Sequence, residues 1–236
     1  MSKTRSKRYR QAAELVGSGK SYSLTDAIST VKKLPAPKFT PTVTLSFRLG
    51  VDPRKSDQMV RGSVSLPHGT GKNVRVVVFA QGAAAEAAIA AGAEHVGYED
   101  LIKKVQEGFV DFDSAIATPD AMAEVRKIAR VLGPRGLMPN PKTGTVTDDV
   151  AKAVKEVKAG RIDFKLDKNG NVSGAIGKAS FDESQLHDNA RAFVDSVVRA
   201  KPASAKGNYI QGVTLAASML PGLPLEAATY AAKATA

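Results

Sequence analysis

The chain has 236 residues, 43% apolar and 24% charged, which predicts one or two globular domains and excludes global disorder or a fibrous repeat. It contains no cysteine, which excludes a disulfide scaffold, a Cys-ligated metal and a thiol nucleophile. The 34 lysines and arginines against 23 aspartates and glutamates give a net charge of +11, so we expect a polyanionic partner.

Neither a secretion signal nor a membrane span is predicted. The basic residues 1–10 run into Gln-Ala-Ala-Glu rather than into the apolar stretch of a leader. The longest uncharged run, residues 207–225, carries Asn208, Gln211 and two prolines, which do not suit a spanning helix. We therefore expect a soluble, cytoplasmic protein with no membrane partner.

The charge is unevenly distributed along the chain. Residues 1–70 carry 13 basic and 4 acidic side chains, residues 71–159 carry 12 of each, and residues 160–236 carry 9 and 7. A neutral block between basic flanks predicts an inserted domain, with the two ends of the chain building one basic domain together. A solvated N-terminal tail is the alternative interpretation, but it leaves the basic surplus between residues 38 and 61 unexplained.

The first segment predicts two helices and then two strands. Residues 8–16 predict a helix, and Ser23 can cap a second one that ends before Pro35. Apolar and polar residues then alternate over 43–49 and over 60–66, which is the period of half-buried strands.

The central block alternates strands with helices. Residues 74–79 are nearly continuous in β-branched residues, as expected of a strand covered on both faces. The other predicted elements, in order, are a helix over 83–91, a strand at 95–96, a helix over 99–107, a strand over 114–117 and helices over 119–132 and 148–158. This alternation predicts a small, parallel, Rossmann-like sheet.

The last segment predicts a hairpin, a long helix and a strand. Residues 162–166 and 172–176 flank Asn169-Gly170, a strong hairpin signal. Residues 183–199 predict an amphipathic helix, and residues 209–215 predict a final strand followed by an Ala-rich tail. The apolar stripe of the helix consists of Leu186, Ala190, Phe193, Val194 and Val197.

These patterns together predict an α/β fold of two domains. A discontinuous α/β domain of α+β character comprises residues 1–68 and 160–236, and an inserted Rossmann-like domain with a parallel sheet comprises residues 69–159. We expect the two connections to hinge at Pro67, Gly69, Ala159 and Gly160.

The sequence contains no recognisable catalytic or cofactor-binding pattern. Gly69-Thr-Gly-Lys72 precedes a strand instead of opening a helix, and residues 81–83 hold one glycine where a dinucleotide fingerprint has three. The histidines, His68, His95 and His187, lack metal-ligand spacing. We therefore expect no enzyme activity, cofactor, metal or small-molecule substrate. A nucleotide-using Rossmann enzyme is the alternative from another class, and it would need the missing glycine-rich turn.

The most unusual stretch is residues 133–144, Gly-Pro-Arg-Gly-Leu-Met-Pro-Asn-Pro-Lys-Thr-Gly, whose prolines and glycines impose a non-helical loop. A rigid connector is the plain interpretation of this loop taken alone. The loop also resembles the diagnostic segment of the bacterial large-subunit ribosomal stalk protein family, the universal ribosomal protein L-one family. Agreement continues in order from about residue 7 to 219, for example at Lys7-Arg-Tyr-Arg10 and Gly177-Lys-Ala-Ser-Phe181.

The resemblance implies a discontinuous domain and an inserted Rossmann-like domain joined by two hinge strands. It implies that the discontinuous domain binds a helical junction of large-subunit rRNA and forms the mobile stalk beside the tRNA exit site. It also implies contact with exit-site tRNA, release of deacylated tRNA, and repression of the protein's own operon mRNA. A free-standing RNA-binding regulator is the alternative within the same class.

Carried over by position, the family's rRNA contacts fall on nine residues: Lys38, Phe39, Thr42, Thr44, Gly177, Lys178, Ser180, Ser218 and Met219. Hydroxyl and backbone groups suit the 2′-OH groups of the shallow minor groove of A-form RNA, and Phe39 can pack on a sugar or a base. Two positions depart from the family's pattern. Leu220 replaces the usual glycine and would crowd the RNA if the backbone meets RNA closely at that point, and Thr44 replaces a residue that is often acidic.

Overall fold

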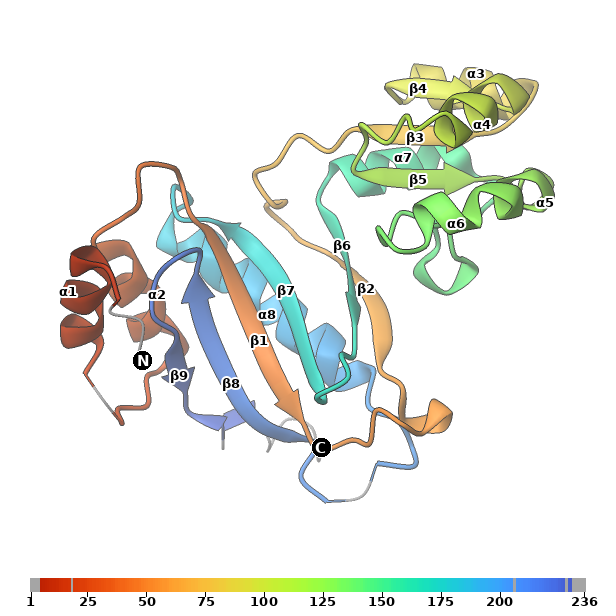
Figure 1. The fold of residues 1–236 in the computed structure, drawn as a ribbon. Helices are drawn as coiled ribbons and strands as arrows, with labels where there is room; N and C mark the ends of the chain where they lie inside the picture. Colours follow the sequence, from red (N-terminus) through yellow and green to blue (C-terminus); the bar gives the residue numbers. More distant parts are fainter. Residues whose placement is uncertain (1–4, 18, 206, 228, 231–236) are drawn as a thin grey trace. The chain divides into compact units, whose positions relative to one another are not determined.

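The computed structural model describes residues 5–17, 19–205, 207–227 and 229–230, with the backbone alone at residue 142. Lys3, which belongs to the basic N-terminal run, lies outside these residues. The chain divides into two compact units (Figure 1). Unit 1 comprises Met1–Gly71 and Ile162–Ala236, and unit 2 comprises Lys72–Arg161. These boundaries lie three and two residues later than the predicted ones.

Local hydrogen bonds explain where the two units divide. The amide of the buried Asn189 accepts from the His68 N–H (3.0 Å) and donates to the Gly69 carbonyl (2.9 Å), which holds this segment in unit 1. On the return path, the Ala159 N–H donates to the Lys155 carbonyl and so completes a helix of unit 2. Arg161 stays with unit 2 because it pairs with Glu156 (2.7 Å).

Unit 1 is built around a four-stranded sheet of order β7-β1-β8-β9. β1 is antiparallel to both β7 and β8, and β9 is antiparallel to β8. A separate two-stranded sheet joins β2 and β6. The elements of this unit are α1 (Lys7–Val16), α2 (Leu24–Lys33), β1 (Thr42–Leu49), the 3-10 turn η1 (Ser56–Gln58), β2 (Arg61–Ser65), β6 (Arg161–Lys165), β7 (Asn171–Lys178), α8 (Glu183–Arg199), β8 (Ile210–Ala217) and β9 (Leu223–Leu225).

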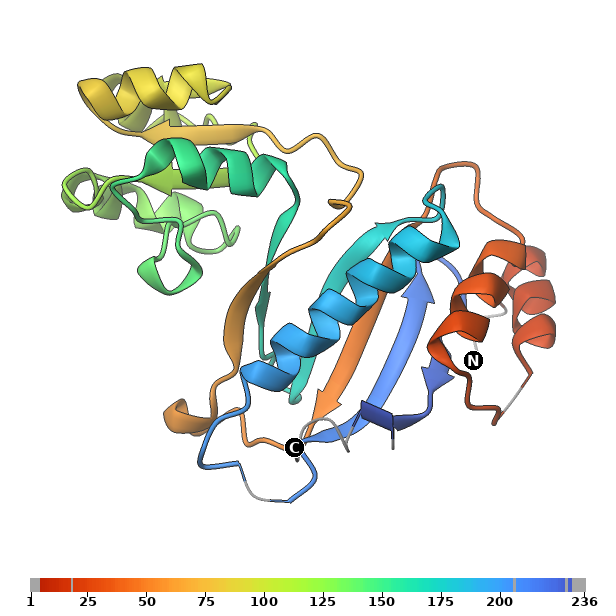
Figure 2. The ribbon, with the colours of Figure 1, turned by 180° about the vertical axis from the view of Figure 1, so that it is seen from behind.

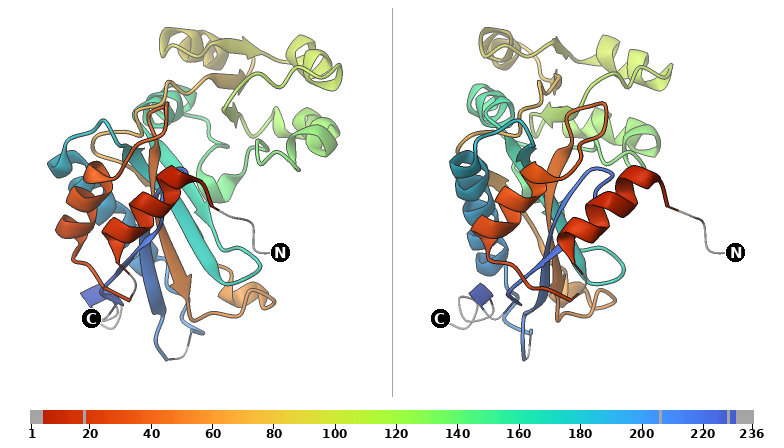
Figure 3. Two further views of the ribbon diagram at one scale, coloured as in Figure 1. Left: turned by 60° about the vertical axis from the view of Figure 1, so that its left-hand side comes forward. Right: turned by 90° about the vertical axis from the view of Figure 1, so that its left-hand side faces the viewer.

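One face of the four-stranded sheet is buried beneath α8, and helices α1 and α2 lie together on the β9 side (Figures 2 and 3). Phe47 of β1 and Phe193 of α8 meet with ring centroids 5.6 Å apart. All five residues of the predicted stripe on α8 are buried, which confirms that prediction. The other face of β1 carries Thr42, Thr44, Ser46 and Arg48, which are half-buried or exposed, and no helix of unit 1 covers it in Figure 1.

The predicted hairpin is wrong, although its turn is present. The Asp167 carboxylate accepts from the N–H groups of Asn169 and Asn171, as in a tight turn. The flanking strands nevertheless separate, because β6 pairs with β2 whereas β7 pairs with β1. Asn-Gly specifies the turn, and the choice of strand partner depends on residues more than a hundred positions away.

The sequence also failed to predict β9 in the tail. Leu223 and Leu225 are buried on either side of the exposed Pro224. Proline cannot donate to a ladder, so it is confined to an edge strand, and β9 is the edge of this sheet. The Pro224 carbonyl accepts from the Tyr22 N–H (3.0 Å), which ties the edge to the start of α2.

Unit 2 contains the predicted parallel sheet, with strand order β4-β3-β5. α3 and α7 cover one face and α4, α5 and α6 cover the other, so all four residues of β3 are buried. The elements are β3 (Val76–Phe79), α3 (Ala83–Ala90), β4 (His95–Gly97), α4 (Glu99–Gln106), β5 (Ser114–Ala117), α5 (Met122–Val125), η2 (Arg126–Ile128), α6 (Ala129–Leu132), η3 (Pro141–Thr143) and α7 (Val150–Lys158).

The helix predicted over 119–132 is interrupted in the structure. It begins only at Met122, and the 3-10 turn η2 separates α5 from α6. Val125 and Ile128, at the two ends of this turn, are both buried. A 3-10 turn aligns residues three positions apart, so the tighter winding keeps both side chains on the sheet face.

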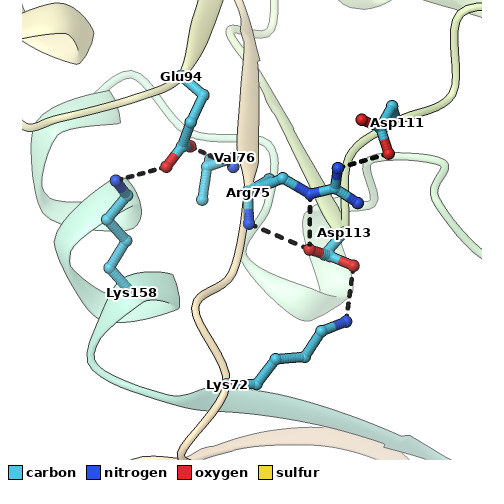
Figure 4. A network of polar contacts seen from close by, with 7 residues as sticks. All are labelled: Lys72, Arg75, Val76, Glu94, Asp111, Asp113 and Lys158. Atoms are coloured by element: carbon cyan, nitrogen blue, oxygen red, sulfur yellow. Dashed lines mark hydrogen bonds and ion pairs between the residues drawn. The ribbon is translucent and has the colours of Figure 1, made fainter.

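Ion pairs fix the start of unit 2 (Figure 4). Asp113 accepts from Lys72 Nζ (2.7 Å) and from the Arg75 backbone N–H (3.2 Å), and Arg75 also pairs with Asp111. The hydrogen bond from Lys72 is the main cause that lowers the pKa of Asp113 below its ordinary value. Beside it, Glu94 accepts from the Val76 N–H and from Lys158. Lys72 and Arg75, which lie before β3 in the sequence, thus both bind carboxylates of unit 2.

Candidate nucleic-acid interface

Three strand ends meet at one corner of the four-stranded sheet. β1 begins at Thr42 and runs antiparallel to both neighbours, so its start lies beside the ends of β7 and β8. The register pairs Thr42 with Lys178, and Val43 with Gly177 and Ala217. Contact positions predicted in three distant segments are therefore brought together. We call this site the strand-end corner; it consists of Lys38, Phe39, Thr42, Lys178, Ser180, Ser218 and Met219.

Thr42 is the centre of the hydrogen bonding at the strand-end corner. Lys178 Nζ donates to Thr42 Oγ1 (2.7 Å), and the Thr42 N–H donates to Ser218 Oγ (3.3 Å). The Ser218 N–H donates to the Thr42 carbonyl (3.0 Å). These bonds hold one cation and two hydroxyl groups in fixed positions, and the ammonium group retains protons for a phosphate or a sugar.

Two large apolar side chains of the corner are open to solvent. Phe39 is 48% exposed and Met219 is 68% exposed, whereas most apolar side chains of unit 1 are buried. Met219 is also the only non-glycine residue with positive φ in the described part of the chain (φ 61°). A left-handed conformation costs a residue with a side chain about 1 kcal/mol or more. The turn after β8 thus holds this side chain outward against its backbone preference.

Thr44 and Gly177 have different surroundings from the rest of the predicted set. Thr44 lies on the open sheet face between Ala175 and Ala216, whose small side chains leave its hydroxyl accessible. Gly177 is buried at a bulge in β7, and a Cβ there would lie 2.9 Å from the Phe181 ring and 3.0 Å from Leu186. Its glycine is therefore required by packing beneath the corner.

Arg8 of α1 also reaches the corner, and the sequence did not single it out. Its guanidinium donates to the Pro35 carbonyl and to the Met219 carbonyl, each at 3.1 Å. It thereby connects the loop before β1 to the turn after β8. The sequence showed Arg8 as one charge in a basic run and as part of the family-like stretch Lys7-Arg-Tyr-Arg10, and neither pattern indicated a contact 211 residues away.

No group of three or more His, Asp or Glu side chains that could hold a metal ion occurs within the described ranges. Gly69-Thr-Gly-Lys72 precedes β3 and opens no helix. No helix of the described chain is long and apolar enough to cross a membrane.

Comparison with known proteins decides the family. Residues 30–221 match the Ribosomal protein L1p/L10e family. The chain belongs to this family. It is 57% identical over 227 residues to the large ribosomal subunit protein uL1 of Bifidobacterium longum subsp. infantis, covering 96% of this chain and 99% of that protein. It is 59% identical over 221 residues to uL1 of Mycolicibacterium smegmatis, covering 94% of each.

Membership of the L1p/L10e family confirms the L-one family part of the resemblance drawn from the loop at 133–144, and it makes the chain a ribosomal protein rather than an enzyme. A third relative, uL1 of Salinispora tropica, is 57% identical over 221 residues and covers 94% of this chain and 93% of that protein. The match is nearly as long as the chain, so both units belong to the family fold.

Leu220 does not crowd the surface of this L1p/L10e protein. Its side chain is only 8% exposed and belongs to the core of unit 1. The Leu220 N–H donates to the Ala217 carbonyl (2.9 Å), which closes the turn that presents Met219. The turn directs Met219 outward and Leu220 inward, so the side chain of Leu220 packs in the core of unit 1.

The net charge of the central block, residues 71–159, is zero, but unit 2 contains a local basic segment that the sequence analysis missed. Residues 122–147 hold five basic side chains and one acidic. Arg126, Arg130 and Arg135 are exposed and have no carboxylate partner among the described residues, whereas Arg75 and Arg161 are paired. We call these three residues the arginine segment. Counting charge over windows of about 25 residues would have shown it.

Proposed function

We propose that this chain binds large-subunit rRNA through the strand-end corner and forms the mobile stalk beside the tRNA exit site. The observation that carries the proposal is that three distant segments meet at one corner with an anchored lysine, two hydroxyls and two exposed apolar side chains. Sequence-specific RNA recognition uses such a combination, with 2′-OH and phosphate contacts supplemented by packing on sugars and unstacked bases.

Sedimentation tests the ribosomal role directly. We expect the chain, added to large subunits that lack it, to sediment with them in a sucrose gradient at moderate salt. A free-standing RNA-binding regulator would bind an isolated RNA and yet remain at the top of the gradient. That result would replace the stalk assignment with the alternative.

A lysine pair tests whether the strand-end corner is the binding surface. Lys178→Met removes the ammonium group that contacts Thr42, and Lys165→Met removes an exposed lysine of β6 outside the corner. We expect Lys178→Met to weaken binding to the stalk-junction rRNA fragment about tenfold, since one charge-assisted contact contributes roughly 1.4 kcal/mol. Lys165→Met should change the affinity less than twofold. Equal effects of the two substitutions would argue against the corner.

Repression of the protein's own operon mRNA follows if that mRNA offers the same contacts as the rRNA. The two RNAs should then compete for one site, and Lys178→Met should weaken both complexes by the same factor. Simultaneous binding of rRNA fragment and mRNA to one chain would separate the two activities and contradict this part of the proposal.

We assign the contact with exit-site tRNA to the arginine segment of unit 2. Arginine binds phosphate bidentately, and unpaired exposed arginines are free to do so. Changing Arg126, Arg130 and Arg135 together to serine should slow the release of deacylated tRNA from ribosomes while leaving rRNA affinity unchanged. The matched control changes Lys103, Lys104 and Lys152, three exposed lysines elsewhere in unit 2. Equal tRNA release by both triple variants would refute the assignment.

A further inference from the structure

A cavity of about 510 Å³ lies next to the strand-end corner, within unit 1. It is bounded by the end of α2, by the loop that leads into β1 and by the turn after β7. Lys38, Phe39 and Ser180 belong both to the corner and to the lining of this cavity. RNA held at the corner therefore has direct access to the cavity.

The walls of the cavity suit a flat apolar group. Leu34 and Leu220, which are 4% and 8% exposed, provide an apolar floor. The half-exposed ring of Phe39 and the ring of Pro37 provide walls on which an aromatic base can stack. Base–aromatic stacking is tolerant of sequence and contributes substantially to binding unpaired nucleotides.

The charge of the cavity lining suits a nucleotide rather than a free apolar molecule. Its cationic side chains are Lys32 and Lys38, and none of the described residues that line it is an aspartate or a glutamate. A nucleotide carries an aromatic base next to a phosphate, which is the same combination of an apolar face and a negative charge. A segment of apolar peptide would fill the walls but leave both ammonium groups without a partner.

We propose that this cavity receives one unstacked nucleotide of the bound RNA, with the base between Phe39 and the Leu220 floor and a phosphate beside Lys32 or Lys38. The inference rests on the proposed rRNA binding and adds a subsite to it. The strand ends contact the backbone of a helix, whereas the cavity selects an RNA that can present one unpaired base beside that helix. Leu220 gains a direct role, because a glycine there would leave the floor without a side chain.

Base removal in the RNA, combined with cavity filling in the protein, tests the proposal. The probe is the stalk-junction rRNA fragment, prepared as a series in which each unpaired nucleotide in turn lacks its base. We expect one position at which removing the base weakens binding to the full unmodified chain at least tenfold. Ala36→Trp places a large side chain at the exposed rim of the cavity and should weaken binding to the intact fragment by a similar factor.

The decisive result is the coupling between the two changes. The abasic fragment should bind Ala36→Trp and the unmodified chain equally, because without the base nothing enters the cavity and filling the cavity has no further effect. Ala87→Trp, at an exposed position of α3, controls for the added side chain and should behave as the unmodified chain. Phe39→Leu keeps the apolar surface but removes the ring, and should reduce the effect of base removal at the same position.

Several outcomes overturn the proposal. If Ala36→Trp binds the intact fragment as tightly as the unmodified chain, the cavity does not take part in binding. If it weakens every abasic fragment to the same extent, the cavity region contacts a helix or a protein and not one base. If circular dichroism shows that Ala36→Trp is misfolded, Phe39→Leu replaces it in the test. An effect of base removal that is equally large in Phe39→Leu and in the unmodified chain then overturns the proposal. Failure of the unmodified chain to bind any fragment would instead refute the proposed function.

Discussion

The side-chain amide of Asn189 donates to the carbonyl oxygen of Gly69 over 2.9 Å and so joins helix α8 to the segment that leaves unit 1. Asn189 is fully buried, and it also donates to the Ile176 carbonyl (2.8 Å) and accepts from the His68 N–H. One side chain thereby satisfies three backbone groups from two separate segments. The path of the chain into unit 2 is fixed at its origin by this residue.

Asn189→Leu should destabilise unit 1 by about 2–4 kcal/mol, because it leaves one buried and two partly buried backbone groups without their partners. Urea denaturation followed by circular dichroism measures the loss. Asp188→Ala is the control, since the pairs of Asp188 with His68 at 3.3 Å and with His187 at 3.9 Å are both exposed, and it should cost less than about 0.5 kcal/mol. An unchanged free energy of unfolding in Asn189→Leu would show that water replaces these hydrogen bonds.

Phe39→Ala and Met219→Ala should weaken rRNA binding while leaving the melting temperature nearly unchanged, because both side chains are exposed. Phe47→Ala removes a ring of β1 that is only 1% exposed, and it should instead cost about 3–5 kcal/mol of stability. Thermal melts and binding isotherms on the same preparations separate the two effects. A large loss of stability in Met219→Ala would mean that its turn packs on the core.

Binding to the rRNA fragment should weaken steeply with salt, because lysines and arginines displace counterions from phosphates. If about 4–6 phosphates are neutralised, the plot of log affinity against log salt should have a slope of roughly −3 to −5. Lys38→Met should reduce the magnitude of that slope by about one. A slope near zero in filter-binding or fluorescence titrations would leave the net charge of +11 without a role in RNA binding.

Local sequence patterns predicted the helices and strands better than they predicted which strands pair with each other. The helix cap at Ser23, the apolar stripe of α8 and the buried run of β3 are properties of short segments, and the structure contains all three. The Asn169-Gly170 turn is local as well, but the pairing of β6 with β2 depends on a strand a hundred residues earlier. β9 was missed because Pro224 interrupts a very short run, and only its position at the sheet edge accommodates it.

The candidate site shows the same division between local and distant information. Nothing in the spacing of Thr42, Lys178 and Ser218 indicates that they meet, and their proximity follows from two antiparallel pairings of β1. The resemblance supplied the positions, whereas the hydrogen bonds around Thr42 supply a physical reason for them. Arg8 and the arginine segment were missed because the sequence showed charge without showing which charges were already paired.

Acid should destabilise unit 2 through Asp113. The hydrogen bond from Lys72 lowers the pKa of Asp113 in the folded state, so its ionised form contributes stability above the ordinary pKa, and this is lost as the pH falls through the lowered value. Asp113→Asn should cost on the order of 1 kcal/mol at pH 7, and the difference should shrink below about pH 4. Urea melts between pH 7 and pH 3 measure it. Asp111→Asn, at a 75% exposed carboxylate, should show little change at any pH.

The last prediction concerns the independence of the two units. Every residue in the core of unit 1 comes from outside Lys72–Arg161, and the two core clusters of unit 2 come entirely from within it. β2 and β6, which lead out of unit 1 and back, are neighbours in one sheet.

Replacing Lys72–Arg161 with a short Gly/Ser linker should therefore leave a folded unit 1, because closing a modest loop costs little. The shortened protein retains every residue of the strand-end corner and should bind the rRNA fragment within a few-fold of the full chain. It lacks the arginine segment, so ribosomes that carry it should release deacylated tRNA as slowly as those with the triple serine variant. Folding by circular dichroism combined with binding more than a hundredfold weaker, about 2.7 kcal/mol, would show that unit 2 contributes to the rRNA site itself.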